Sequence, residues 1–345
     1  MKSFWPGKSV LVTGGASFIG SHLVEKLVDA GAKVRVADDL SSGKLENLNK
    51  ILEQIDFQKG DLRDRNFADT SAQDSEVVFH LAASHGGRGY IDTHPVECVT
   101  NMILDGTVFA AAHRAGVDRV VFASSACVYP VGLQTKPRDG KFVQLREDSV
   151  DPLSASGAAS DGEYGWAKLM GEMALKAYHK QYGLKGVSCR IFTAYGEREN
   201  ETHAVIALIA KAFVKMDPYV IWGTGEQDRN FTYVADIADG LMLAAENAPD
   251  CSAINLGATE HIKIREVAEM IFDYIGFRPN KLEFDLDKPV GVYSRAADLT
   301  RTRELLNWEP QTEFSAGLRR TIDWYLATHD QQTVAARLDS LLTER

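Results

Sequence analysis

Apolar and polar positions alternate along the first half of the chain in two distinct patterns. Short apolar runs have the length of buried strands, and the stretches between them have the period of amphipathic helices. The strand-like runs lie near residues 9–13, 34–38, 55–58, 77–81, 119–124 and 186–192. The longest helical patterns cover about 95–115 and 164–182. Strands that alternate with helices predict an α/β fold with a doubly wound parallel sheet.

The pattern changes near residue 193, where short strands and helices begin to mix. We therefore expect residues 1–192 to form one domain, whose sheet is completed by part of 230–256. Residues 193–330 are expected to form mainly a smaller mixed α/β lobe, and 331–345 a polar helical tail. The segment 131–163 is rich in Gly, Pro, Ser and Asp, which predicts a long surface excursion.

Composition and charge restrict the classes of partner. With 48 acidic against 38 basic residues, the chain has a net charge of −10, so nucleic acid and anionic membranes are poor partners. No apolar window is long enough to span a membrane, and the N-terminus lacks the apolar core of a signal peptide. We expect a cytoplasmic protein with reduced thiols. The cysteines form no Cys-x-x-Cys pair, which argues against a metal site or a disulfide framework: Cys98, Cys127, Cys189 and Cys251.

A glycine-rich turn follows the first predicted strand. In Thr13-Gly14-Gly15-Ala16-Ser17-Phe18-Ile19-Gly20 the chain turns tightly and opens a helix to about Asp29. Outward N–H groups and the helix dipole at such a turn favour a pyrophosphate. About twenty residues on, Asp38 ends the second strand, where a carboxylate can accept hydrogen bonds from the adenosine ribose of NAD. The predicted NAD contacts are Gly14, Ser17, Phe18, Ile19, Gly20 and Asp38, with Asp61 and Leu62 beside the adenine.

Tyr164 and Lys168 form a Tyr-x-x-x-Lys motif on a predicted helix. A spacing of four places both side chains on one face. A free tyrosine has a pKa of about 10, and a nearby ammonium and the positive nicotinamide ring favour its phenolate. Tyr164 is therefore a candidate base that takes a proton from a substrate hydroxyl, with Lys168 also holding the nicotinamide ribose.

With these motifs, nearly the whole chain resembles the extended short-chain dehydrogenase/reductase family, which acts on nucleotide sugars. The resemblance implies a Rossmann domain, NAD, and a nucleoside diphosphate sugar as substrate. It implies that Ser125 holds the reacting hydroxyl and that Arg229 and Arg295 lie near the diphosphate. It also implies a homodimer built on helices 95–115 and 164–182. The residues that carry it are Thr13 to Gly20, Asp38, Asp61, Ser125, Tyr164, Lys168, Arg229 to Asp236, Asn255 to Gly257, and Arg295 before Asp298.

The residues after Ser125 distinguish the reactions of this family. Relatives that are dehydratases or decarboxylases carry a carboxylate there, and this chain has Ala126-Cys127-Val128-Tyr129-Pro130. That segment is similar to the one in the GDP-mannose 3,5-epimerase subfamily, as is Gly86 to Ile91. This likeness implies Cys127 as a base and, at the position of a lysine acid, His203, which can donate or accept a proton near neutral pH. It implies substrate contacts from Gly86, Gly87, Arg88 and Thr193.

Other interpretations stay open at this point. A 4-epimerase needs only Ser125, Tyr164, Lys168 and NAD. An NADPH-dependent reductase is disfavoured by Asp38, because a carboxylate repels the extra phosphate. An NAD-binding regulator without catalysis is disfavoured by the intact Tyr164 and Lys168. Cys127 can also be a small residue that only fills space in the core, and His203 can be a surface residue. We expect His80 to be a core histidine, and His85 is a weak candidate for the site.

Overall fold

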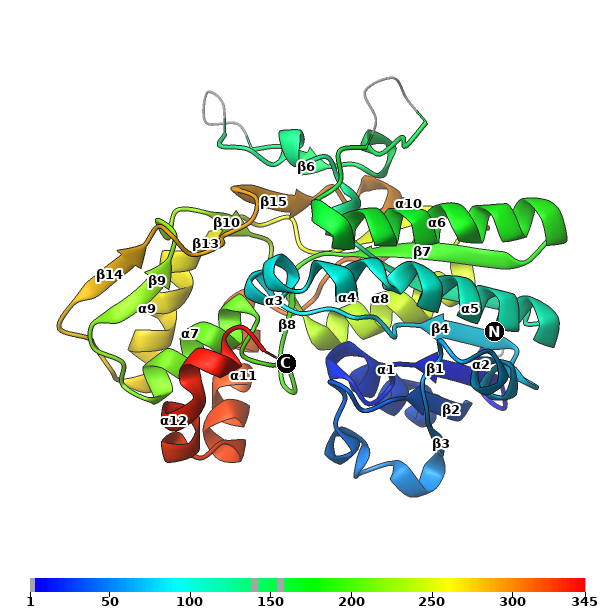
Figure 1. Ribbon diagram of the computed structural model, residues 1–345, viewed down its shortest axis with the longest axis horizontal. Helices are drawn as coiled ribbons and strands as arrows, with labels where there is room; N and C mark the ends of the chain where they lie inside the picture. The colour runs from blue at the N-terminus through cyan, green and yellow to red at the C-terminus, as the bar shows by residue number, and fades with distance from the viewer. Residues whose placement is uncertain (1–3, 138–141, 154–157, 345) are drawn as a thin grey trace.

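The computed structural model describes residues 4–137, 142–153 and 158–344. A seven-stranded parallel sheet forms one half of the molecule (Figure 1), in the order β12-β7-β5-β4-β1-β2-β3. The predicted doubly wound parallel sheet is confirmed. Its strands are β1 (Ser9–Thr13), β2 (Lys33–Asp38), β3 (Asp56–Lys59), β4 (Val77–His80), β5 (Arg119–Ser125), β7 (Lys185–Ile191) and β12 (Ala253–Leu256).

Helices cover both faces of this sheet because its strands are apolar on both sides. In β1, Val10 and Val12 join one buried cluster and Leu11 joins the other. One layer contains α1 (Phe18–Asp29) and α8 (Val234–Asn247), with α10 (Thr300–Leu306) beside β12, and the other contains α2 (Arg65–Ala72), α5 (Asn101–Ala115) and α6 (Gly162–Tyr182).

The single helix expected over 95–115 is two helices, α4 (Pro95–Val99) and α5, which meet at Thr100. The Thr100 hydroxyl donates to the backbone carbonyl of Glu97 at 2.7 Å. The break turns Asn101 onto the backbone of Ser84, where it accepts a hydrogen bond at 2.7 Å and donates one at 2.9 Å. This contact anchors the loop that follows β4, which carries the predicted residues 86–88.

The second half of the molecule is a mixed lobe around a separate apolar core. Its short sheets are β13-β10-β15-β6, β14-β9 and β11-β8. These strands are β6 (Gln144–Leu145), β8 (Ala194–Tyr195), β9 (Tyr219–Trp222), β10 (Asp228–Arg229), β11 (Thr232–Tyr233), β13 (Ile262–Lys263), β14 (Leu282–Asp285) and β15 (Ser294–Ala297). The helices are α7 (Ala204–Phe213), α9 (Ile264–Ile275), α11 (Phe314–Thr328) and α12 (Gln331–Leu341), and the short α3 (Arg88–Thr93) precedes α4.

The C-terminal tail and the excursion both take part in this lobe. In the tail, α12 packs on α7 and buries Val334 and Leu338 in the lobe's core. In the excursion, β6 pairs with β15, while residues 138–141 and 154–157 lie outside the described residues, as do 1–3 and 345 at the ends of the predicted domains. Over the described ranges, no helix combines the length and apolar character needed to cross a bilayer.

Candidate active site

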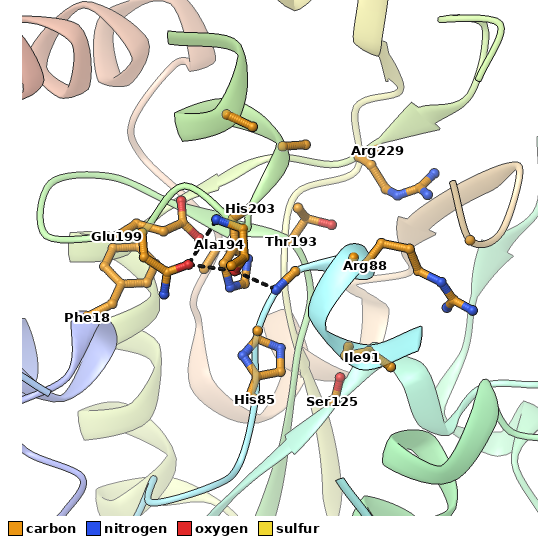
Figure 2. A pocket seen from close by; sticks show the side chains of 18 of the residues that line it. Phe18, His85, Arg88, Ile91, Ser125, Thr193, Ala194, Glu199, His203 and Arg229 are labelled. Carbon is orange, nitrogen blue, oxygen red and sulfur yellow. Dashed lines mark hydrogen bonds and ion pairs between the residues drawn. The ribbon is translucent and has the colours of Figure 1, made fainter. Parts of the chain in front are cut away.

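A cavity of about 410 Å³ lies between the two halves of the molecule and collects most of the predicted site residues. Parallel strands present such crevices at their carboxyl ends. The sheet half supplies Ser125 at the end of β5 and Tyr164 and Lys168 on α6, and the second lobe supplies His203 and Arg295 (Figure 2 shows part of this lining). Also in the lining are Ser17, Phe18, Ile19, Gly86, Gly87, Arg88, Cys127, Thr193 and Arg229.

The glycine turn after β1 is as tight as predicted for a dinucleotide site. Gly14 has a φ of +68°, and a Cβ there would lie 2.8 Å from the backbone nitrogen of Ala82. A Cβ on Gly20 would lie 2.1 Å from the carbonyl oxygen of Gly14. Ser17, which replaces the usual middle glycine, donates its hydroxyl to the same carbonyl. The turn therefore leaves the helix N-terminus open to a pyrophosphate, and it fits NAD.

Asp38 ends β2 beside this turn and is 5% exposed. Its carboxylate accepts backbone hydrogen bonds from Ala16 and Leu40, each at 2.9 Å. Burial raises the pKa of Asp38, and the two N–H donors lower it. Asp61 forms an ion pair with Arg63 at 2.7 Å, and Leu62 is buried. Asp38, Asp61 and Leu62 all lie outside the cavity lining.

Tyr164 and Lys168 face the cavity from one side of α6, and Tyr164 is hydrogen-bonded to Ser125. The ammonium of Lys168 lies 5.9 Å from the centre of the Tyr164 ring. Burial raises the pKa of Tyr164 well above 10.0, neighbouring Cys127 raises it further, and the bond to Ser125 lowers it. Burial lowers the pKa of Lys168. The phenolate therefore needs a further positive charge beside it.

Cys127 lies next to a cation, as its predicted role requires. The guanidinium of Arg295 donates to Cys127 Sγ at 3.4 Å, to Gln134 Oε1 at 2.6 Å and to Asp161 Oδ2 at 3.0 Å. Burial alone would lower the pKa of Arg295, but Cys127 and Asp161 outweigh it and raise that pKa. A neighbouring cation favours the thiolate form of a cysteine.

Asp161 was not singled out in the sequence, although it precedes Tyr164 by three residues. It is the N-cap residue of α6, but its side chain makes no capping bond. It bridges Arg88, at 2.8 Å, and Arg295 instead. Burial alone would raise the pKa of Asp161, but the two arginines lower it below its usual value. An aspartate before a helix normally signals a cap, which hides this role in the sequence.

Arg229 also lines the cavity, and backbone carbonyls hold its guanidinium. It donates to Asp228 at 2.6 Å and to Val290 at 2.9 Å. Burial and the charge of Arg295 lower the pKa of Arg229 to about 10. Two guanidinium groups in one cavity repel each other, and a diphosphate bound between them would relieve that repulsion.

His203 is the N-cap residue of α7, and its Nδ1 lies 3.2 Å from Glu199 Oε1. Burial lowers the pKa of His203 to about 4 and raises that of Glu199 well above 4.5. The other Glu199 oxygen has no hydrogen-bond partner among the described residues. Burial therefore favours the neutral form of both groups. Glu199 was missed because an isolated glutamate in a loop carries no sequence signal.

His85 lies beside these groups, on the loop after β4. Its ring centre is 4.9 Å from that of Tyr164 and 5.1 Å from that of His203. His85, which was a weak candidate from the sequence, therefore lines the cavity. His80 is fully buried, with its Nε2 3.0 Å from Asp105, and acts as the core histidine that was expected.

Gly87 allows the same loop to pack against the second lobe, and Gly86 allows it to pack against Tyr90 of α3. A Cβ on Gly87 would lie 1.6 Å from the carbonyl oxygen of Thr202, and one on Gly86 2.6 Å from Tyr90. The backbone of Gly87 donates to the Thr202 hydroxyl at 2.9 Å. Their requirement for glycine thus comes from protein contacts at the edge of the cavity.

Trp222 also lines the cavity and was not predicted. The ammonium groups of Lys211 and Lys288 each lie 5.5 Å from its ring centre. Burial and Lys288 lower the pKa of Lys211 to about 8. This part of the lining therefore presents a flat aromatic ring and positive charge.

The sequence profile described as the NAD dependent epimerase/dehydratase family matches residues 10–257. The chain belongs to this family of NAD-dependent enzymes. It is 29% identical over 320 residues to a putative UDP-glucose 4-epimerase of Methanocaldococcus jannaschii, covering 91% of this chain and 97% of that protein. It is 30% identical over 331 residues to the GDP-mannose 3,5-epimerase of Arabidopsis thaliana, covering 94% and 84%.

Solved structures show the same fold. The UDP-glucose 4-epimerase of Thermotoga maritima, solved with UDP-glucose, is 27% identical with a TM-score of 0.80, over 93% of this chain and 99% of that one. The UDP-glucose 4-epimerase of Thermus thermophilus, solved with NAD, is 25% identical with a TM-score of 0.78, over 93% and 100%. NAD is the cofactor of the family, and the glycine turn described above fits it.

Proposed function

We propose that this protein is a nucleotide-sugar epimerase that works through a transient 4-keto sugar, of the GDP-mannose 3,5-epimerase type. The observation that supports this most is that Cys127 and His203 share a cavity with Ser125, Tyr164 and Lys168. The last three suffice for oxidation at C-4. A thiol and an imidazole in addition provide for proton transfer at carbon.

The first step is oxidation of the sugar at C-4. When bound, NAD supplies a reversible two-electron oxidation. Ser125 holds the C-4 oxygen, and Tyr164, to which it is hydrogen-bonded, takes the hydroxyl proton. Lys168 adds positive charge on the same face of α6 and holds the nicotinamide ribose.

The second step is inversion at C-3 or C-5, whose hydrogens the ketone makes acidic. Cys127, next to the Arg295 guanidinium, removes the proton as a thiolate. The Glu199–His203 pair supplies a proton to the opposite face, with the Glu199 carboxyl replenishing the imidazole. Tyr164 then returns its proton to the C-4 oxygen as the ketone is reduced.

The remaining surfaces of the cavity suit the nucleotide. Arg229 and Arg295 lie where a diphosphate relieves their mutual repulsion, and Arg88 adds a third guanidinium, held by Asp92 and Asp161. Trp222 offers a ring for stacking a nucleobase. A nucleoside diphosphate sugar carries the three groups, sugar, anion and base, that these residues suit.

A 4-epimerase of the UDP-glucose type is the second candidate. It is favoured by the Ser125, Tyr164 and Lys168 set, which is complete without Cys127 and His203. Here Tyr164 and Ser125 act at C-4 alone, and no carbon-bound proton exchanges with water.

Turnover in heavy water distinguishes the two. We expect GDP-mannose to take up solvent deuterium at C-3 or C-5, read by NMR, with no net consumption of added dinucleotide. Inversion at C-4 of UDP-glucose without deuterium uptake would establish the second candidate instead. Steady consumption of NADH or NADPH would contradict both and indicate a reductase.

A further inference from the structure

His85 lies next to both Tyr164, the base of the proposed oxidation, and His203, the proposed proton donor. Its ring centre lies 4.9 Å from that of Tyr164 and 5.1 Å from that of His203. Figure 2 shows it on the loop after β4, below His203. It lines the same cavity as both, and the proposed steps do not use it.

The groups on either side of His85 extend this row. Tyr164 packs with Cys127 in one small buried cluster. Beyond His203 lies Glu199, 3.2 Å from its Nδ1 and with one oxygen unpartnered among the described residues. Five proton-carrying side chains therefore follow one another from the proposed base to the proposed donor.

Inversion at carbon makes such a row useful. In each inversion Cys127 gains a proton and the Glu199–His203 pair loses one, so both must be reset before the next. Direct exchange of the Cys127 proton with bulk water is restricted, since Cys127 is 9% exposed and Tyr164 5%, whereas the His203 side chain is 22% exposed. A route inside the protein would carry the proton from the buried thiol to this more exposed imidazole, which exchanges with solvent.

We propose that His85 is the proton-transfer residue that resets this pair, carrying a proton from the Cys127 side to His203; this rests on the proposed function. After Tyr164 has returned its proton to the C-4 oxygen, the S–H bond of Cys127 breaks as its proton passes to the Tyr164 oxygen, which passes it on to one ring nitrogen of His85. The other ring nitrogen of His85 gives a proton to His203. No electrons move, and the net change is one proton from sulfur to the His203–Glu199 pair.

The His85 ring would occupy the same position if it only filled space. Phenylalanine can replace histidine in a packing role but not in a proton-transfer role. His85→Phe keeps a flat ring against Tyr164 and His203 but carries no proton. His85→Ala leaves a gap that added imidazole can enter. His113→Phe is the matched control, because His113 stacks on Tyr182 and is absent from the cavity lining.

The experiment follows GDP-mannose in heavy water with the NAD-loaded protein, by rapid quench and NMR, and follows C-4 oxidation by the absorbance of reduced nicotinamide. We expect His85→Phe to carry out the first C-4 oxidation and to complete one round of deuterium uptake per site. Later rounds should then slow by about a hundredfold, the usual scale of lost acid–base catalysis. Imidazole should accelerate the slow phase of His85→Ala and leave His85→Phe unchanged.

Several results would overturn the proposal. If His85→Phe sustains wild-type turnover, or if His85→Ala binds NAD and oxidises C-4 but does not respond to imidazole, His85 only packs. If His85→Phe loses C-4 oxidation together with exchange, the ring positions Tyr164. If the wild-type protein itself takes up no deuterium, the proposed inversion at C-3 or C-5 fails, and the reset step fails with it.

Discussion

Glu199 and His203 acquire their chemistry from burial. Glu199 is 4% exposed, and burial raises the pKa of its carboxyl and lowers the pKa of the neighbouring imidazole. A carboxyl with a raised pKa retains its proton to higher pH and can pass it to the imidazole. The loop geometry that brings them together is therefore as important as the histidine itself.

Glu199→Gln should change how stability depends on pH. The pKa of Glu199 is raised above 4.5 in the folded state, so the unfolded carboxyl ionises first as pH rises. Its stability contribution is fully present below about pH 4.5 and is lost as pH rises towards the folded pKa. The melting temperature of the variant should therefore rise relative to wild type as pH increases from about 4.5. Parallel melting curves against pH would contradict the raised pKa of Glu199.

Cys127→Ala and His203→Ala should separate the two proposed steps. Each removes a proton-transfer group but leaves Ser125, Tyr164 and Lys168 in place. We expect deuterium uptake from heavy water to fall by at least about a hundredfold while C-4 oxidation, read by reduced nicotinamide, persists. Loss of oxidation as well would mean that these residues serve binding or folding.

At the level of elements, the turn between β1 and α1 decides whether the cofactor fits. In Gly20→Ala the new Cβ would lie 2.1 Å from the Gly14 carbonyl, so the helix must move away from the strand. We expect NAD affinity, measured by calorimetry, to fall by tenfold or more, since each 1.4 kcal/mol is about tenfold. Gly132→Ala is the control, because nothing lies within 4 Å of its Cβ. Unchanged NAD affinity in Gly20→Ala would show that the turn does not bind the cofactor.

The sequence predicted these elements where local pattern determines structure. The β1 strand, the glycine turn and α1 follow from apolar period and glycine spacing, and α6 follows from its helical pattern. The helix break at Thr100 could not be predicted from the local pattern, because it depends on a contact between Asn101 and Ser84 across the fold.

For the site, the sequence predicted residues that belong to motifs. Asp161 was missed because it meets Arg295 across 134 residues, a contact that forms only when the second lobe folds against the sheet. Trp222 was missed because the lysines near its ring come from two separate segments. Glu199 was missed because an isolated glutamate in a loop carries no sequence signal.

For the whole molecule, α5 and α6 lie side by side (Figure 1) and leave large apolar side chains in solvent. Met102 is 43% exposed and Ile103 58% on α5, and Trp166 and Met170 are each 43% exposed on α6. Helix faces of this kind are typical of subunit contacts. We therefore expect a symmetric homodimer.

Light scattering coupled to size-exclusion chromatography tests whether the protein is a dimer. The wild-type protein should elute with twice the chain mass, and Trp166→Glu should shift the population to monomer, because it places a charge in an apolar contact. Leu153→Glu, at an exposed leucine outside these helices, is the control and should remain dimeric. A monomeric wild-type protein at micromolar concentration would contradict the prediction.

The most direct test of the account is rapid mixing of the NAD-loaded protein with GDP-mannose while the absorbance of reduced nicotinamide is recorded. We expect a transient that rises as C-4 is oxidised and falls as it is reduced, with no net change after many turnovers and no transient in Tyr164→Phe. Epimerised product without any such transient, or an undiminished transient in Tyr164→Phe, would contradict the proposed chemistry.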